Sequence, residues 1–101
     1  MMARELYIIT VCGLGTGTAL FLKIQVSNAV RELGYNARVE TADASQAKNI
    51  KCDIIVTAPD LAKMLRAQGA FAKEIVEIKN YMNKQELKEK LKKAINKVLS
   101  S

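Results

Sequence analysis

Apolar stretches typical of strands alternate with stretches of helical periodicity along this sequence, and that alternation restricts the fold most. We expect strands over residues 6–11, 37–41, 54–56 and 74–78, and helices over residues 19–33, 61–67 and 84–99. Strands that are separated by helices pair in parallel through right-handed crossovers, which places helices on both faces of the sheet. The sequence therefore predicts an α/β fold with a four-stranded parallel sheet between two layers of helices.

The composition of each strand predicts its position in the sheet. Residues 6–11 and 54–56 are continuously apolar, as the central strands of a parallel sheet are. The strands at 37–41 and 74–78 carry charged side chains and are expected at the edges. The resulting strand order, 2-1-3-4, describes a flavodoxin-like or Rossmann-like three-layer sandwich. In that order the chain reverses direction beside the first strand, and such folds bind ligands in the crevice at the carboxyl end of that strand.

The length and composition are typical of one domain. Of the 101 residues, 50% are hydrophobic, which is enough to bury one core, so we expect a single domain over residues 1–101. No apolar run approaches the roughly 18 residues of a membrane span, and the first residues lead into a strand without a signal cleavage site. We therefore expect a cytoplasmic protein in which Cys12 and Cys52 are free thiols.

Histidine is absent from the sequence, and its absence excludes several kinds of site. Ser-His-Asp triads, Cys-His pairs, histidine-ligated zinc and phosphohistidine on this chain are all impossible. We expect no metal and no cofactor. Any nucleophile on this chain must be activated without an imidazole base.

The net charge of +6 is concentrated at one end of the chain. Residues 79–101 hold seven lysines and two glutamates, whereas the charges of residues 1–78 nearly cancel. Within that segment the apolar residues Leu87, Leu91, Ile95 and Val98 recur at helical spacing. This pattern predicts an amphipathic helix that packs on the core and turns its lysines to solvent. Because no aromatic or arginine cluster accompanies the lysines, we expect no nucleic-acid partner.

A glycine-rich loop follows the first strand and is the most specific motif. Three glycines at alternate positions let the backbone turn tightly and direct N–H groups inward, and the following helix adds its positive end. Cys12 stands at the first position, where these groups favour a thiolate. The hydroxyls of Thr16 and Thr18 can contact phosphate oxygens or cap the helix, and both interpretations stay open. The candidate phosphate-binding residues are Gly13, Leu14, Gly15, Thr16, Gly17 and Thr18.

Other phosphate-binding loops match this segment less well. A Walker loop has a lysine after its last glycine, and residues 13–19 contain none. The dinucleotide-binding fingerprint needs one more residue between its second and third glycines. The Cys-x5-Arg loop of tyrosine phosphatases needs arginine at position 18, where this chain has Thr18. A hydroxyl in place of that arginine favours a site that holds a phosphoryl group without promoting its hydrolysis.

The loop and its surroundings resemble the IIB components of the bacterial phosphoenolpyruvate-dependent sugar phosphotransferase system, most closely the ascorbate-specific branch, which is related to the galactitol-specific one. The resemblance extends through residues 41–45 and 53–57 to the lysine-rich last helix, so it covers nearly the whole chain. The residues that carry it near the loop are Cys12, Leu20, Leu22, Lys23 and Val26. Leu14 stands where the family loop more often has a polar residue.

The resemblance implies a phosphotransferase that works through phosphocysteine. Cys12 would accept phosphate from a phosphohistidine of the IIA component and pass it to a sugar, L-ascorbate in the ascorbate branch, bound by the membrane permease IIC. The chain would then associate with the inner face of the membrane through IIC. Two alternative hypotheses for the function are that the chain is a hydrolase related to low-molecular-weight tyrosine phosphatases, or that it is a non-catalytic nucleotide-binding or nucleic-acid-binding domain.

The loops after the second strand (42–47) and the third strand (57–60) should open onto the same edge as Cys12. The expected partner contacts are Leu14, Asp43, Ser45, Pro59 and Asp60. For Asp60 a helix N-cap is the simpler role, and for Asp43 and Ser45 a turn. Cys52, which has no glycine loop beside it, is expected to be a buried core residue. Met64 and Phe71, which have apolar neighbours, are also expected in the core.

Overall fold

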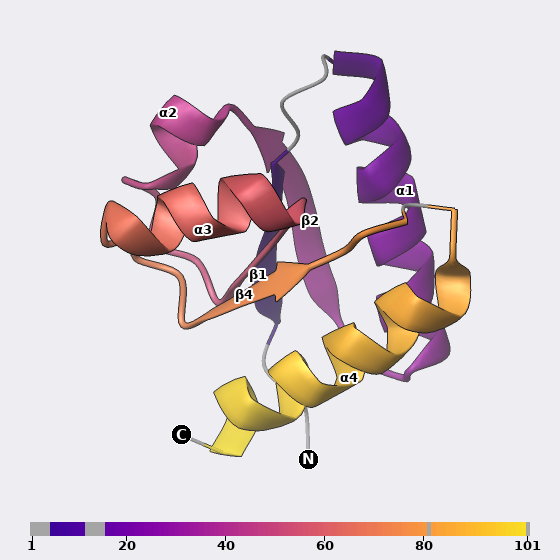
Figure 1. Cartoon of the computed structure of the whole chain (residues 1–101). Coiled ribbons are helices and arrows are strands. Elements are labelled where there is room, and N and C mark those ends of the chain that lie inside the picture. The colour runs from indigo at the N-terminus through magenta and orange to yellow at the C-terminus, as the bar shows by residue number, and fades with distance from the viewer. Residues whose placement is uncertain (1–4, 12–15, 81, 101) are drawn as a thin grey trace.

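A computed structural model describes residues 5–11, 16–80 and 82–100, with the backbone but not the side chains of residues 16–19. Strands and helices alternate throughout (Figure 1). The strands are β1 (Leu6–Val11), β2 (Ala37–Ala42), β3 (Ile54–Thr57) and β4 (Glu74–Glu77), and the helices are α1 (Thr16–Glu32), α2 (Ala44–Ala47), α3 (Pro59–Ala67) and α4 (Lys84–Ser100).

The four strands form one parallel sheet in the order β2-β1-β3-β4, which confirms the predicted topology. The strands β1 and β3 are central, as their apolar composition predicts. β1 pairs with β2 over its whole length, from Leu6 opposite Ala37 to Val11 opposite Ala42. The architecture is that of a flavodoxin-like α/β fold.

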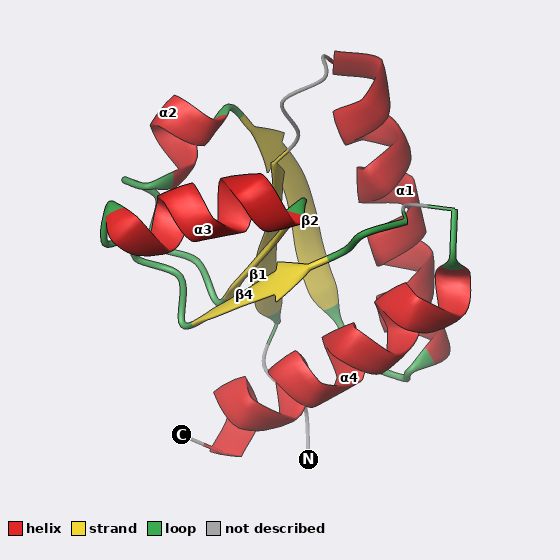
Figure 2. Ribbon diagram, viewed as in Figure 1, coloured by secondary structure: helices red, strands yellow, loops and turns green. Residues whose placement is uncertain are grey.

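The helices α1 and α4 cover one face of the sheet, and α2 and α3 cover the other (Figure 2). The residues of β1 point alternately to the two faces, so Leu6 and Ile8 belong to one core and Ile9 and Val11 to the other. The larger core lies under α1 and α4 and contains the predicted α4 residues Leu87, Leu91, Ile95 and Val98. The smaller core lies under α2 and α3 and contains Cys52, which is 7% exposed, as predicted.

Glycines end two of the helices. Gly34 follows α1 with φ of 86°, and Gly69 follows α3 with φ of 71°. This left-handed conformation, which glycine adopts at little cost, lets the next backbone N–H groups close onto the last turn. Tyr35 N–H donates to the Val30 carbonyl oxygen at 3.1 Å, and Ala70 N–H to that of Leu65 at 3.1 Å.

Two expectations about the elements were wrong by more than the shifts of one or two residues found at other element ends. Residues 42–47 were expected to be a loop, but Ala44–Ala47 form the short helix α2, which buries Ala47. Four residues are too few to produce a helical apolar repeat in the sequence. The helix α1 begins at Thr16 rather than at residue 19, so Thr16, Gly17 and Thr18 lie in its first turn and not in the loop.

Three residue assignments also differ from expectation. The N-cap of α3 is Ala58 rather than Asp60, because Pro59 occupies the first helical position and Asp60 follows it in the first turn. Met64 and Phe71 are exposed rather than in the core. The helix α3 turns Ala62 and Leu65 inward, which directs Met64 outward, and Phe71 lies in the connection to β4.

Candidate functional site at the carboxyl edge of the sheet

The fold brings the candidate residues to the carboxyl edge of the sheet. β1 ends at Val11 and α1 begins at Thr16, so residues 12–15 connect a central strand to the start of a long helix. Cys12, Gly13, Leu14 and Gly15 themselves lie outside the described residues. Figure 1 shows that α1 begins, and α2 lies, at the end of the sheet toward which β2 points.

The ends of β2 and β3 flank the end of β1. Val11 lies opposite Ala42 of β2, and Thr10 lies opposite Val56 of β3. The chain turns into α2 and α3 directly after these strands, so the connections on both sides of residues 12–15 share one edge. This is the edge at which parallel α/β folds place their ligands.

A buried hydrogen bond joins the two central strands at this edge. The Thr57 hydroxyl, which is fully buried, donates to the carbonyl oxygen of Val11 at 2.8 Å. Val11 is the residue before Cys12, so this bond fixes the backbone from which the loop departs. Sequence reasoning missed Thr57. Its only signal was a hydroxyl residue that closes the apolar run 54–56.

The expected partner-contact residues outside the loop lie at the same edge. Asp43 is exposed at the N-cap of α2, and Ser45 is exposed on α2 itself. Pro59 is half-buried at the start of α3, and Asp60 is exposed beside it. Thr16, Gly17 and Thr18 begin α1, and their side chains are outside the described features.

Helix ends make this edge favourable for an anion. The first turn of α1 starts directly after residue 15, and α3 starts directly after Thr57 and Ala58. The first N–H groups of a helix have no partner within the helix and carry a partial positive charge. An anionic sulfur or a phosphoryl group bound before Thr16 would therefore be stabilised.

Cys52 occupies the opposite kind of environment. It precedes β3, at the amino edge of the sheet, and belongs to the core under α2 and α3. Burial, together with the negative charge of neighbouring Asp53, raises the pKa of the Cys52 thiol from 9.0 to about 11. Near neutral pH this thiol is protonated, so it is a poor nucleophile.

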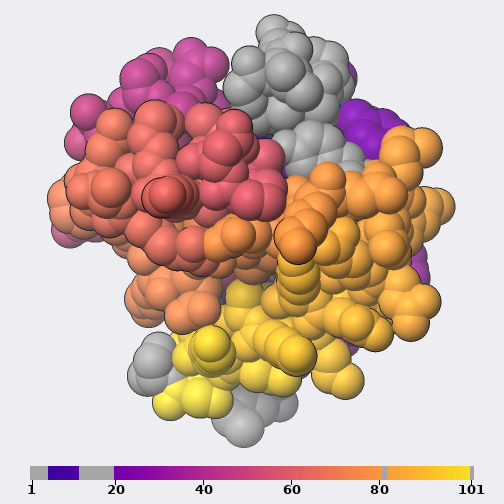
Figure 3. Space-filling model, viewed as in Figure 1, coloured from indigo at the N-terminus to yellow at the C-terminus, as the bar shows by residue number. Residues whose placement is uncertain are grey.

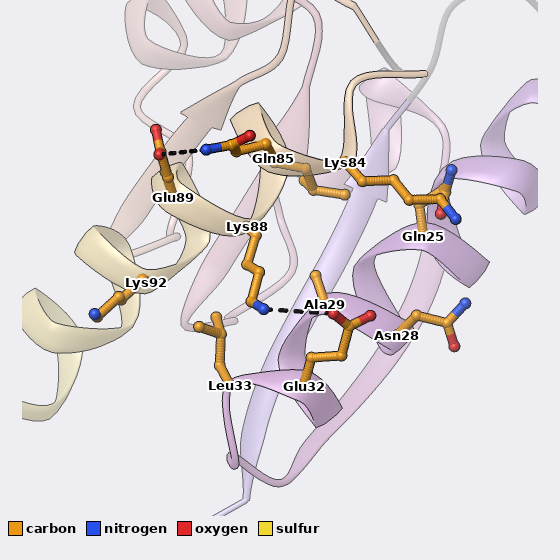
Figure 4. A pocket seen from close by; sticks show the side chains of 11 residues that line it. Gln25, Asn28, Ala29, Glu32, Leu33, Lys84, Gln85, Lys88, Glu89 and Lys92 are labelled. Atoms are coloured by element: carbon orange, nitrogen blue, oxygen red, sulfur yellow. Dashed lines mark hydrogen bonds and ion pairs between the residues drawn. The ribbon is translucent and has the colours of Figure 1, made fainter.

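A hollow lies away from this edge, between α1 and α4 (Figure 4). It has a volume of about 470 Å³, and Gln25, Asn28 and Lys84 are among the residues that line it. Lys88 on its α4 side pairs with Glu32 of α1 at 3.4 Å. Lys88 is thus paired with an acidic residue across the helix interface, and the groove contains side chains of both charges.

The described part of the chain was compared with two patterns, that of a metal-binding cluster and that of a membrane-spanning helix. Residues 5–11, 16–80 and 82–100 contain no cluster of three or more cysteine or acidic side chains that could hold a metal ion. Over the same residues, none of the helices combines the length and apolar character needed to cross a bilayer.

Comparisons with known proteins agree on the family and differ in the sugar for which the matching proteins are named. Residues 7–93 match the family model described as "PTS system, Lactose/Cellobiose specific IIB subunit", where PTS denotes the phosphotransferase system. A relative named "Ascorbate-specific PTS system EIIB component", from Mycoplasma pneumoniae, is 37% identical over 97 residues, which is 94% of this chain and 100% of the relative.

A solved structure shares the fold. The lactose-specific IIB component domain from Streptococcus pneumoniae superposes with a TM-score of 0.62 at 14% sequence identity, covering 92% of this chain and 97% of that one. The family match over residues 7–93 and the relative of 37% identity show that the chain belongs to the PTS IIB family and is a IIB component of a sugar phosphotransferase system.

Proposed function

We propose that Cys12 carries the phosphoryl group between a IIA component and a sugar bound by the permease IIC. In the first transfer the P–N bond of a phosphohistidine on IIA breaks and an S–P bond forms at the Cys12 thiolate, while the freed imidazole nitrogen takes up a proton from solvent, to which the thiol had released its own. In the second transfer the S–P bond breaks and phosphorus bonds to a sugar hydroxyl oxygen, whose proton is released to solvent. Each transfer conserves the phosphoryl group and consumes no water.

The observation that carries this proposal is the position of Cys12 within the IIB match. It follows Val11, the last residue of a buried central strand, and comes four residues before α1 begins. The only other cysteine, Cys52, is buried at the opposite edge with a raised pKa. The amino end of α1 supports the thiolate of Cys12 electrostatically, which compensates for the missing histidine base.

The loop and the first turn of α1 supply the remaining groups of the proposed site. Backbone N–H groups of residues 13–18 would hold the phosphoryl oxygens, and the hydroxyls of Thr16 and Thr18 are candidates for further hydrogen bonds. Surface residues at the same edge, Leu14, Asp43, Ser45, Pro59 and Asp60, would contact the partners. The carrier needs no metal or organic cofactor in this scheme.

We assign the whole chain, residues 1–101, to one IIB domain that acts in the cytoplasm and reaches the membrane through IIC. L-Ascorbate is the proposed sugar, since the relative that matches over its full length bears the ascorbate-specific name. Sugar-phosphate formation with permease vesicles and either L-ascorbate or lactose tests this choice. Phosphorylation of lactose but not of L-ascorbate would contradict it.

The experiment that tests the carrier function is intact-mass analysis after incubation with phosphoenolpyruvate and the general and sugar-specific phosphotransferase proteins. We expect the mass of one phosphoryl group to be added when IIA is present and none when IIA alone is omitted. Label that appears without IIA, or continuous release of inorganic phosphate by the chain, would contradict a carrier role.

A further inference from the structure

The outward face of α1 carries large apolar side chains next to the proposed phosphoryl site. Leu20 is 52% exposed, Phe21 37% and Ile24 53%, although α1 also buries Leu22 and Val26 against the sheet. Leu20 and Ile24 are one helical turn apart and therefore share one side of the helix, with Phe21 beside them. We call Leu20, Phe21 and Ile24 the α1 patch.

The apolar character of this face is confined to one end of the helix. Farther along the same side, Asn28 and Arg31 are exposed and polar, as expected for a helix surface in contact with water. Leu20 lies four residues after Thr16, which places it about 6 Å along the helix axis from the start of α1. The exposed apolar residues of α1 are thus the ones closest to the loop.

The chain before α4 carries another exposed apolar side chain in the neighbourhood of α1. Lys84 of α4 and Gln25 of α1 line the same groove, so the segment that leads into α4 lies beside α1. Figure 3 shows this segment, in orange, next to the purple surface of α1. Met82 in that segment is 71% exposed. Large exposed apolar side chains, with aromatic and methionine residues among them, are typical of protein-binding sites.

We propose that the α1 patch is the apolar anchor on which the IIA component docks to deliver its phosphoryl group. This inference depends on the proposed carrier function, because a donor histidine that reaches Cys12 must bring its own surface over the start of α1. Apolar contact there would hold the two proteins while the reacting atoms align.

Charge favours IIA over the permease as the partner of this patch. Lys23 lies within the segment of α1 that carries the patch, and Lys84 lines a groove together with Gln25 of α1, so a complementary surface is apolar at its centre and carries carboxylates at its rim. Cytoplasmic loops of membrane proteins are enriched in lysine and arginine, and such loops would be repelled by this rim.

Single substitutions of exposed residues test the proposal. In Leu20→Glu and Ile24→Glu, we expect the KM for phosphorylated IIA to rise by about tenfold or more, with the limiting rate of phosphorylation nearly unchanged. The neutral variants Leu20→Ser and Ile24→Ser should raise the KM in the same direction, which separates lost apolar contact from added charge. Circular dichroism and thermal unfolding should match the unmodified protein, and the serine variants replace any glutamate variant that does not fold.

The matched control is Phe71→Glu. Phe71 is 56% exposed, as much as Leu20 and Ile24, but lies in the connection between α3 and β4, which enters the sheet at its amino edge. This variant should keep the original KM for IIA. Equal increases in all variants would overturn the proposal, because the effect would then follow exposed apolar area in general.

The outcomes also distinguish this inference from the carrier function on which it depends. Failure of the unmodified chain to accept phosphate from IIA contradicts the carrier function itself. Normal phosphorylation of the chain, with an unchanged KM in the Leu20 and Ile24 variants, contradicts only the docking proposal. Variants that accept phosphate normally but transfer it poorly to sugar in permease vesicles would assign the patch to IIC and likewise overturn the proposal.

Discussion

At the scale of single residues, the two cysteines are expected to differ most in the pKa of their thiols. Burial and the Asp53 charge raise the pKa of Cys52 to about 11. The carrier function instead requires Cys12 to have a pKa below its ordinary value of about 8.5, because the helix end favours the thiolate. In a Cys52→Ser variant, iodoacetamide should therefore react with Cys12 at neutral pH. In a Cys12→Ser variant, Cys52 should react only in strongly alkaline solution or after unfolding.

The raised pKa of Cys52 also has a consequence for stability. Between pH 9.0 and about 11 the unfolded thiol loses its proton while the folded thiol keeps it. The contribution of Cys52 is thus fully present below pH 9.0 and is lost as the pH rises toward 11. Between pH 9.0 and about 11, the free energy of unfolding of a Cys52→Ala variant should therefore fall less than that of the unmodified protein. Equal alkylation profiles for the two cysteines would contradict the assigned environments.

The hydroxyl of Thr57 offers a second test at this scale. Thr57→Val removes the hydrogen bond to the Val11 carbonyl while keeping the shape of the side chain. We expect a loss of about 1 kcal/mol in the free energy of unfolding by urea, and slower phosphorylation by IIA because the start of the loop is less firmly held. Thr10→Val is the control, since its bond to the Glu40 carbonyl is long, at 3.4 Å, and lies on the other face of the sheet.

This prediction requires that Thr57→Val slow phosphorylation by IIA more than Thr10→Val does. Equal effects of the Thr57 and Thr10 substitutions on the phosphorylation rate would contradict a specific role for the Thr57 bond. Such a contact could not be predicted from the sequence, because its partners are 46 residues apart and the bond depends on the register of two strands. Cys12, in contrast, could be singled out because its glycine loop is local in sequence.

At the scale of elements, the amino end of α4 depends on a side-chain cap. The Asn83 side-chain oxygen accepts a hydrogen bond from Glu86 N–H at 3.0 Å, and the Asn83 carbonyl accepts one from Leu87 N–H at 3.3 Å. A hydrogen bond from Lys90 lowers the pKa of Glu86, which keeps that carboxylate charged at the positive helix end.

Removal of this cap should destabilise the protein without affecting the chemistry. We expect Asn83→Ala to lower the free energy of unfolding by about 1 kcal/mol. The limiting rate of phosphorylation at Cys12, measured at saturating IIA, should be unchanged, because Asn83 lies outside the loop and the first turn of α1. Lys93→Ala, an exposed position in the middle of α4, should have little effect on stability. An equal loss in both variants would argue against a capping role for Asn83.

The regular elements could be predicted where many residues contribute to one pattern. The apolar repeat of Leu87, Leu91, Ile95 and Val98 predicts α4, and the continuous apolar runs predict that β1 and β3 are central. The helix α2 was missed because four residues make no repeat. The exposure of Met64 and Phe71 was missed because apolar neighbours in sequence do not fix which side of a short helix or loop faces the core.

At the scale of the whole molecule, the two edges of the sheet have different roles. The carboxyl edge gathers the ends of the central strands, the starts of α1 and α3 and the α1 patch, whereas the amino edge buries Cys52 and Asp53. The strand order was enough to predict this division. The proposed docking surface could not be predicted in full, because the exposed side of α1 becomes evident only once its buried side is known.

The central claim is that the phosphoryl group resides on Cys12. The most direct test compares the two cysteines after incubation with phosphoenolpyruvate and the general and sugar-specific phosphotransferase proteins. Intact mass should show one added phosphoryl group on the unmodified chain and on Cys52→Ser, and none on Cys12→Ser, with all three proteins folded by circular dichroism. A Cys12→Ser variant that still carries a phosphoryl group would contradict the account, provided that the group is released under mild acid or base that leaves phosphoserine intact. A Cys52→Ser variant that accepts no phosphoryl group would also contradict it.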